Sequence, residues 1–588
     1  AGLGWSLSTS EIRDAGKGFF NSVTATRTGL TIAFDDIFYL RPRTITVTDP
    51  ATGAAVDPFR LAGYRVQTAS GNRYGADTVL GVGPGEGTSN RTVDTARNAF
   101  ANAKRDFSLR VPLTLKAGLD VRQTMRDYRG GTTAYTYVGP DGLANSADDT
   151  AAPFRDPVYS ARDGVFGFPK TERIGGGLLY EALRRNPAHF VKNDNTIYRS
   201  AINLSKRAEE TVSSGFVRAD AAFFQRRLRV MGGVRVEQTN ISAEGPLSDP
   251  AGNYRRDARG AVIVDNFGRP QAIVPNSDPL GVSRLTLLDR GYTAHKEYLH
   301  VLPRFTASYN LRENLIARVA YSHALGRPNY NQYAGGLTLP DETLPPSFGN
   351  RITVNNVALK PWTAHTMQVS LERYFEGVGI VSVGGFRRDF RNFAGVTLFA
   401  ATPEFLANYN LEPATYGGYD VATQFNIPGS VRSEGFDVSY KQALTFLPPW
   451  ARGVQVFANG AVTHFTNDAV DAFANSIPKT ASWGVSLNRE RYVLRANWNY
   501  KSRHRRAAIT PGFSIEPGTY AWGSKRLFVD LVGEYRLTRR FTLFGTIRNL
   551  QDTPEDFSRE GPNTPDVAKF RQRDRYGALW TFGVKGAF

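Results

Sequence analysis

The chain of 588 residues contains no cysteine, so no disulfide can hold any part of its fold together. This absence fits an oxidising compartment, where unpaired thiols are readily oxidised. Mean hydropathy is negative, at −0.35, and no apolar run approaches the length of about 18 residues that a transmembrane helix needs. The sequence therefore excludes a helical membrane protein. A membrane-spanning barrel stays possible, because its strands need an apolar residue only at every second position.

Histidine is also scarce. The seven histidines are scattered singly, mostly without a second ligand at metal-binding spacing, so we expect no transition-metal site. The glycine-rich stretch 81–87 lacks the Gly-Lys-Ser/Thr ending of a phosphate-binding loop, so it is interpreted as a flexible loop. No nucleophile stands with a positioned base, and no carboxylate pair has a recognisable setting. The prediction is that the protein is not an enzyme.

Glycine (57), phenylalanine (37) and tyrosine (26) are abundant, a balance that favours strands and tight turns and hence an all-β fold. The net charge is +18, but the 72 Lys and Arg residues are spread evenly rather than gathered in a stripe, which argues against a nucleic-acid partner. Basic residues at a membrane rim would instead meet the phosphates of outer-membrane lipid and lipopolysaccharide. Basic residues in a lumen would attract anionic solutes.

Side chains alternate between apolar and polar at period two along much of the C-terminal half, as in strands with two different faces. The stretch from Leu299 to Tyr309 places Leu299, Val301 and Phe305 on one side and Arg304 on the other. The same pattern recurs at 315–322, 367–372, 436–440 and 491–500. One face is apolar and aromatic, whereas the other carries too many charges for the interior of a small sandwich. A transmembrane antiparallel β-barrel with a wet lumen accommodates both faces.

Connections between the predicted strands alternate between short and long, as do the periplasmic turns and extracellular loops of outer-membrane barrels. Short turns are predicted at 112–114, 226–228, 311–314, 376–379, 488–490 and 538–540. Long loops are predicted at 129–214, 241–296, 326–362, 393–431, 504–525 and 552–575.

The last strand supplies independent evidence for a membrane barrel. Trp580, Phe582 and the terminal Phe588 share one face, an ending similar to the C-terminal signal that the bacterial barrel-assembly machinery reads. We therefore expect the barrel-assembly machinery to be a partner.

Several stretches in turn resemble the TonB-dependent receptors, large outer-membrane barrels of Gram-negative bacteria that import scarce solutes. They run in family order over roughly the last two-thirds of the chain. They are RRLRVMGGVRVEQT (226–239), YLHVLPRFTASYNLRENLIARVAYSHALGRPNY (298–330), NNVALKPWTAHTMQVSLERYF (355–375), SEGFDVSY (433–440), IRNLQDTP (547–554) and the closing YGALWTFGVKGAF. The resemblance implies a multi-pass barrel in the outer membrane.

The chain departs from the family at its N-terminal end, where neither the globular plug nor the TonB-contacting box is recognisable. About 15 strands are predicted from Asn98 onward, with two or three before it, against about 22 in plugged transporters. We therefore interpret residues 1–588 as barrel, forming the C-terminal majority of a larger one, with the plug and first strands elsewhere. The alternative is a divergent plugless barrel with fewer strands.

The resemblance implies active import of a siderophore, cobalamin, glycan or peptide, with energy from the TonB–ExbB–ExbD complex transmitted through the plug. Two other functions stay open, namely a passive plugless pore and a structural or adhesive surface barrel. We expect the charged face to line a solute path or grip a plug, or else to form cross-strand ion pairs along the lumen wall. Its predicted lumen-facing members are Arg235, Glu237, Arg304, Arg318, Glu372, Arg495, Asp530, Glu534 and Arg548.

Two loops carry candidate binding residues. In the 326–362 loop, Tyr330, Asn331 and Tyr333 are candidates for an outer substrate mouth, whereas Trp362 fits an interfacial anchor. The segment GPDGLANSADDT gathers oxygen ligands of the kind that Ca²⁺ favours, without the full EF-hand spacing, so an acidic solvated loop is the alternative. The candidate Ca²⁺ ligands are Asp141, Asn145, Asp148 and Asp149. No other cofactor is expected.

Overall fold

A computed structural model describes residues 1–13, 20, 22–38, 41–72, 90–164, 169–329, 334–347, 349–354, 359–375, 379–469, 476–509 and 515–587. Among these residues, none of the helices combines the length and the apolar composition that a membrane-spanning helix requires.

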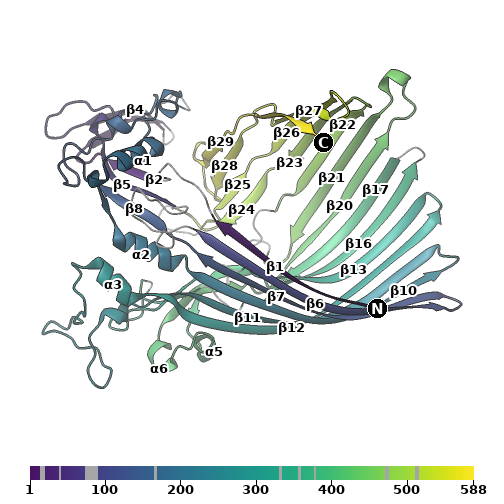
Figure 1. The fold of residues 1–588 in the computed structure, drawn as a ribbon, viewed down its shortest axis with the longest axis horizontal. Helices are drawn as coiled ribbons and strands as arrows, with labels where there is room; N and C mark the ends of the chain where they lie inside the picture. Colours follow the sequence, from purple (N-terminus) through teal and green to yellow (C-terminus); the bar gives the residue numbers. More distant parts are fainter. Residues whose placement is uncertain are drawn as a thin grey trace.

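A wall of sixteen strands, each antiparallel to the next, dominates the described residues (Figure 1). It belongs to a 20-stranded sheet that also contains four short loop strands. In chain order the wall strands are β1 (Gly2–Arg13), β6 (Arg91–Ser108), β7 (Pro112–Arg129), β10 (Lys206–Phe223), β11 (Leu228–Ser248), β12 (Leu287–Arg312), β13 (Leu315–Gly326), β16 (Trp362–Phe375), β17 (Gly379–Arg391), β20 (Ser430–Ala443), β21 (Val454–Thr466), β22 (Lys479–Asn488), β23 (Tyr492–Lys501), β26 (Arg526–Arg536), β27 (Phe541–Arg548) and β30 (Leu579–Gly586).

Strand register aligns apolar side chains in rows across one face of the wall. Leu119 lies opposite Gly215, which lies opposite Val236, which lies opposite Val301. These side chains are exposed to the surroundings, since Leu119 keeps 67% of its surface accessible and Val301 keeps 50%. Exposed apolar rows of this kind form the lipid-facing band of a membrane barrel. We call this face the outer face and the opposite one the inner face.

Aromatic residues mark one margin of the outer face. They lie near the ends where neighbouring strands are joined by short turns, at the level where the aromatic girdle of a membrane barrel meets the lipid headgroups. The outer-face aromatics at this margin are Phe107, Tyr309, Phe375, Tyr440, Tyr492, Tyr535 and Phe541.

The predicted alternation of short and long connections is observed, but several boundaries are wrong. The first turn is at 109–111 rather than 112–114, and Pro112 begins β7, a strand position that proline tolerates. The second lies at 224–227, so Leu228 is already in β11. The turn predicted at 311–314 is shorter, because β12 continues to Arg312.

The long loops were predicted too long for a common reason. β10 begins at Lys206, β11 runs to Ser248 and β12 begins at Leu287. These strands continue beyond the apolar band of the outer face. There the outer face is polar, while buried residues such as Ala208, Ala243 and Ala294 lie on the inner face beneath the loop elements, so the outward apolar alternation ends although the strand does not.

The long connections carry structure of their own at the opposite end from the short turns (Figure 1). One module combines strands β2 (Ser22–Thr26), β5 (Arg65–Asn72), β8 (Thr132–Tyr137) and β9 (Phe190–Lys192) with helix α1 (Gly176–Arg185). Its core includes Val66, Tyr135, Phe154 and Leu179. Because this module has its own buried core, residues from the first two long connections fold as one unit.

Other loop elements form smaller assemblies at the same end. Helix α2 (Asp194–Asn203) contacts helix α3 (Pro279–Thr286). Helices α5 (Pro403–Ala407) and α6 (Pro413–Tyr416) contribute to a second buried cluster. The remaining strands are β3 (Thr31–Phe38), β4 (Arg41–Thr48), β14 (Leu337–Thr338), β15 (Ile352–Val354), β18 (Ala394–Ala400), β19 (Asp420–Asn426), β24 (His504–Ala508), β25 (Tyr520–Gly523), β28 (Glu555–Glu560) and β29 (Phe570–Asp574), and the last helix is α7 (Asp566–Lys569).

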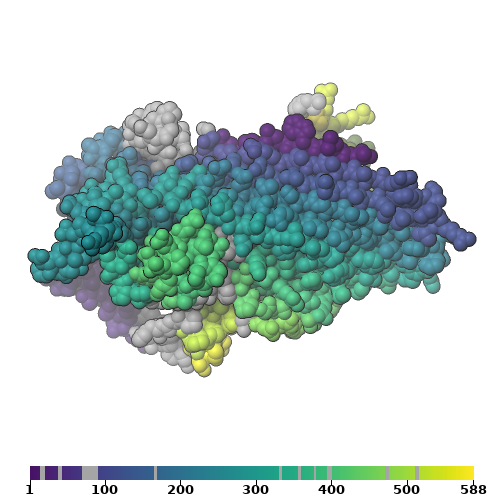
Figure 2. Space-filling view, turned by 90° about the horizontal axis from the view of Figure 1, so that it is seen from below, coloured from purple at the N-terminus to yellow at the C-terminus, as the bar shows by residue number. Residues whose placement is uncertain are grey.

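Figure 2 shows the wall from below as a long surface running from blue to teal, with a green loop segment standing out from it. At its two ends, β1 pairs with β6 and β30 pairs with β27. Within the described residues, no ladder joins β1 to β30, and Trp5 on β1 keeps 80% of its surface accessible. The described wall thus has two open edges.

Candidate functional site

A network of charged side chains lies on the inner face of β7, β10 and β11. Arg235 donates from Nη2 to Oδ1 of Asp120 at 2.8 Å and from Nε to Oε1 of Glu237 at 2.5 Å. Arg327, just beyond β13, donates from Nη2 to Oε2 of Glu237 at 2.6 Å. Its Nε also lies 3.7 Å from a carboxylate oxygen of Glu210. Glu237 is therefore held between two guanidinium groups.

Strand register explains why these side chains meet. Asp120 lies opposite Ser214, and Ser214 lies opposite Glu237, so the three project from the same face in one row. The Ser214 hydroxyl donates to the Asp120 carboxylate. Arg235 precedes Glu237 by two residues and therefore shares its face. Alternation along each strand is sufficient to assemble the network.

The network is balanced in charge, and Glu237 at its centre is shielded from solvent. Arg122 interacts electrostatically with both Asp120 and Glu210, so three guanidinium groups face three carboxylates. Glu237 is only 9% exposed, and a carboxylate so shielded needs its ionic partners. Such a network can stiffen the wall, and its residual donors and acceptors can bind a polar surface placed against it.

Other predicted lumen-facing residues also form cross-strand contacts. Arg318 on β13 donates to Glu372 on β16 at 2.8 Å, and Tyr374 donates to the same carboxylate at 2.9 Å. Lys585 on β30 donates to Glu534 at 2.6 Å, although β27 lies between their strands. Register places the remaining predicted residues on the inner face as well, and these are Arg304, Arg495, Asp530 and Arg548.

Sequence analysis missed four members of the network, namely Asp120, Arg122, Glu210 and Arg327. Asp120 is the polar residue between Leu119 and Val121 of β7, so alternation alone assigns it to the inner face. Glu210 was placed inside a predicted loop. Arg327 follows the last residue of β13, where no strand pattern marks it.

Several other predicted residues lie apart from this network. Trp580 and Phe582 point to the outer face of β30, with accessible fractions of 55% and 70%. Trp362 begins β16 and packs edge-on against Phe390, with ring centroids 5.8 Å apart. The mouth candidates Tyr330, Asn331 and Tyr333 and the terminal Phe588 lie outside the described residues.

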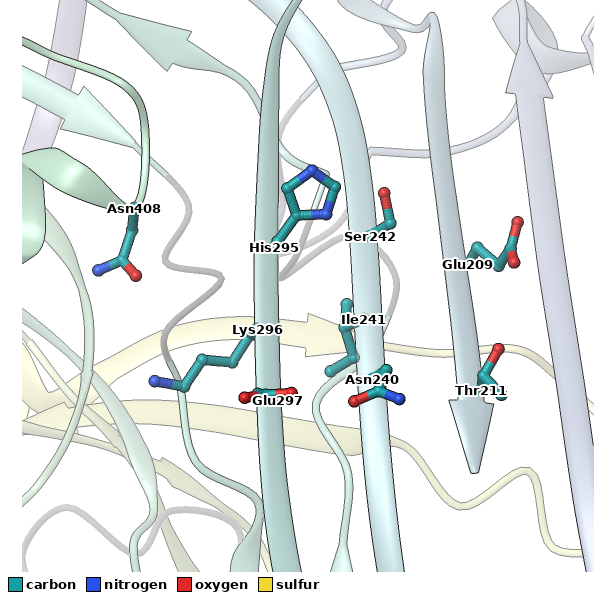
Figure 3. Close-up of a pocket in the computed structure, with 9 residues that line it drawn as sticks. All are labelled: Glu209, Thr211, Asn240, Ile241, Ser242, His295, Lys296, Glu297 and Asn408. Atoms are coloured by element: carbon teal, nitrogen blue, oxygen red, sulfur yellow. The ribbon is translucent and has the colours of Figure 1, made fainter. Parts of the chain in front are cut away.

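A polar pocket of about 470 Å³ lies towards the long-loop ends of β10, β11 and β12 (Figure 3). In Figure 3 the side chain of Lys296 extends towards the neighbouring segment that carries Asn408. The pocket is lined by Glu209, Thr211, Asn240, Ile241, Ser242, His295, Lys296, Glu297 and Asn408. Its lining combines acidic, basic and amide groups with apolar surface, so it can contact both polar and apolar parts of a molecule.

The candidate Ca²⁺ ligands lie together in the loop that follows β8. Asp148 and Asp149 approach one another beside Gly139, and Asp141 lies next to Asp148, to which it donates its backbone N–H at 3.1 Å. Asn145 adopts a positive φ of 63° in the same loop. Across the described part of the chain, no three His, Cys, Asp or Glu side chains already converge on a single metal position.

The chain belongs to the family of TonB dependent receptor-like β-barrels, whose family model matches residues 39–550. This match confirms the resemblance drawn from the sequence. Members of the family are outer-membrane transporters and not enzymes. No curated protein sequence matches the chain.

Solved structures of outer-membrane transporters are similar to the chain at low identity. The ferric-catecholate import receptor Fiu of E. coli K12 is 13% identical, with 89% of this chain aligned to 60% of that one and a TM-score of 0.46. The copper transporter OprC is 14% identical, with 89% and 61% covered and a TM-score of 0.45. The FrpB iron transporter of Neisseria meningitidis is 10% identical, with 99% and 68% covered and a TM-score of 0.46. The chain thus spans about 60% of the length of the first two proteins.

Proposed function

We propose that the chain is the barrel of an outer-membrane receptor that imports a scarce solute with energy from the TonB complex. The family match over residues 39–550 carries this proposal. The solute classes are those implied at the sequence level, namely siderophore, cobalamin, glycan or peptide.

The arrangement of side chains supports a receptor of this kind. The outer face presents apolar rows to lipid, whereas the inner face carries the Asp120–Arg235–Glu237–Arg327 network. A plug domain inside a barrel needs a polar wall to contact, since buried polar groups of the plug must find hydrogen-bond partners. The network supplies both donors and acceptors for that contact.

The two open edges support a larger barrel. Unpaired backbone groups at β1 and β30 would be costly in lipid, and we propose that further strands outside the described wall satisfy them. β1 runs from the short-turn end to the loop end and β30 runs the other way. An even number of added strands therefore keeps every pairing antiparallel. A barrel of about 22 strands, the number in plugged outer-membrane transporters, would add an even number of strands to the sixteen of the wall.

Growth and uptake tests examine the transport proposal. Deletion of the gene should cause a growth defect when one scarce solute is limiting, and inactivation of TonB should reproduce the defect for that solute. Uptake that persists without TonB would contradict the proposal and favour a passive pore. Single-channel recording on the full-length protein gives a second readout, because a plugged receptor should conduct weakly and an open barrel of this width strongly.

A further inference from the structure

The loop between β8 and the 3-10 helix Ala152–Phe154 is anchored to the rest of its module by backbone hydrogen bonds. Val66 donates its N–H to the carbonyl of Asp149 at 2.8 Å, and Ala151 donates to the carbonyl of Tyr64 at 2.8 Å. These contacts hold Asp149 against the edge of β5, where none of its surface is accessible. A carboxylate is therefore fixed in the interior of the module.

Two carboxylates converge on the same space in this loop. Gly139 has a φ of 59°, and a Cβ placed on it would lie 2.8 Å from Oδ2 of Asp148 and 2.9 Å from Oδ1 of Asp149. Any residue larger than glycine would fill the space between these oxygens and the backbone. Glycine at position 139 leaves that space open.

Asp149 is only half satisfied. Its Oδ2 accepts a hydrogen bond from the backbone N–H of Ser146 at 3.1 Å, whereas its buried Oδ1 finds no donor among the described residues. A buried carboxylate oxygen without a donor costs free energy unless a cation or a proton compensates it. A cation in this loop would remove that penalty.

Asn145 holds the shape of the loop by hydrogen bonds, whereas the carboxylates are available to a cation. Arg65 donates to its backbone carbonyl at 2.5 Å, and Gln67 donates to its side-chain oxygen at 3.2 Å. Because both oxygens already accept hydrogen bonds, Asn145 shapes the loop. Asp148 and Asp149 are the candidate primary ligands, with Asp141 beside them, because their carboxylates carry a negative charge and the Asn145 amide does not. The Asp148 oxygens also accept hydrogen bonds, from the backbone N–H of Asp141 and the hydroxyl of Ser146.

We propose that the 139–149 loop binds one Ca²⁺ ion between Asp148 and Asp149, with Asp141, backbone carbonyls and water completing an oxygen shell. Calcium accepts six to eight oxygen ligands in irregular geometry, which suits a loop with two fixed carboxylates, whereas Mg²⁺ demands a near-ideal octahedron. The ion would lock this loop to β5 and so stiffen the module. In a chain without cysteine, a metal supplies the cross-link that a disulfide would otherwise supply. The proposal is independent of the transported solute.

Calcium titration of the full-length receptor in detergent tests the site. Isothermal titration with CaCl₂ should show a single site with a Kd of roughly 10⁻⁴ to 10⁻³ M, the range of extracellular calcium modules. Limited proteolysis should cut the 139–149 loop more slowly in calcium than in EDTA, and MgCl₂ should not substitute. Absence of binding, or equal cleavage in calcium and EDTA, would overturn the proposal.

Substitutions separate this site from a general ionic effect. Asp148→Asn and Asp149→Asn should each weaken calcium binding on the order of tenfold or more, because each removes a charged ligand. Asp163→Asn is the matched control, since that exposed aspartate of the same module pairs only loosely with Lys170, at 3.4 Å, and should leave the affinity unchanged. If Asp149→Asn fails to fold, Asp148→Asn and the calcium response of the unaltered protein still decide the question. Equal affinity in Asp148→Asn and the unaltered protein would overturn it.

Discussion

Arg235 on β11 binds Asp120 on β7 across the whole width of the intervening strand β10, with Nη2 2.8 Å from Oδ1. The two residues are 115 positions apart in sequence. The contact is diagonal, because Asp120 is level with Glu237 while Arg235 lies two residues before Glu237 on β11. The Asp120 carboxylate, which also accepts from the Ser214 hydroxyl on β10, therefore links three strands, and it does so on the face that a plug would meet.

Replacing Arg235 with alanine should destabilise the barrel. The substitution leaves the Asp120 and Glu237 carboxylates without a shared partner in a shielded setting, and we expect a loss of about 1–3 kcal/mol in the free energy of unfolding. Urea unfolding of the protein folded into lipid vesicles measures it. Arg218→Ala is the matched control, because Arg218 pairs with Asp220 on its own strand at 2.8 Å, and it should cost under about 1 kcal/mol. An equal loss in the free energy of unfolding for both variants would show that the cross-strand contact stabilises the barrel no more than a pair within one strand.

Charge placed on the two faces of β16 should have opposite consequences. Val369 lies in the apolar row, opposite Val319 and Gly385, so Val369→Arg puts a charge into lipid and should cost about 2–4 kcal/mol. Its neighbour Gln368 points to the inner face, and Gln368→Arg should cost little. Unfolding in vesicles with both variants measures the difference. A larger cost for Gln368→Arg would reverse our assignment of the two faces.

The faces of the wall were predictable from sequence, because the alternation of apolar and polar residues within each strand shows which side chains face outward and which face inward. The alternation from Leu299 to Tyr309 assigns Arg304 to the inner face before any pairing partner is known. The Arg318–Glu372 pair was not predictable as a contact. Its register depends on where the connection between β13 and β16 returns to the sheet, and period two carries no information about that.

The loop modules were harder to predict for a different physical reason. The buried cluster around Val66, Tyr135 and Leu179 joins residues from two connections that are separated by the barrel strands β6 and β7. Each connection alone has too few apolar residues to indicate a core, since the core exists only when both are together. The acidic loop was recognisable from composition, but the burial of Asp149 depends on β5 and was not.

The ion pair between Arg318 and Glu372 should contribute little to stability by itself. Both side chains are partly exposed, and cross-strand pairs of this kind are worth about 0.2–1 kcal/mol. A double-mutant cycle with Arg318→Ala and Glu372→Ala measures the coupling free energy. A coupling well above that range would mean that Tyr374, which also donates to Glu372, strengthens the pair. Repeating the cycle in a Tyr374→Phe background distinguishes the two contributions.

Protonation of Asp341 in acid should separate two long connections, the one between β11 and β12 and the one between β13 and β16. Tyr254 donates to its Oδ2 at 2.6 Å, and the backbone and hydroxyl of Thr343 donate to its Oδ1 at 3.0 and 2.7 Å. Burial opposes ionisation, but these hydrogen bonds outweigh it and hold the pKa of Asp341 below its ordinary value. Because the folded-state pKa is depressed, the stabilisation is fully present above the ordinary aspartate pKa of about 3.9 and is lost as pH falls through the lower folded value.

Spin labels measure this separation directly. The chain has no cysteine, so single cysteines at Arg259 and Leu344 would carry labels on the two connections without interference. The distance distribution should stay narrow from neutral pH down to about pH 5 and broaden below about pH 4. Asp341→Asn should broaden it already at neutral pH, because the neutral amide is a weaker acceptor for Tyr254. Asp278→Asn, which alters only the N-cap of α3, is the control.

A second ion pair joins the same two connections, because Arg256 pairs with Glu342. Part of the distance distribution can therefore stay narrow in Asp341→Asn. If adding Glu342→Gln removes this narrow part, the Arg256–Glu342 pair accounts for it.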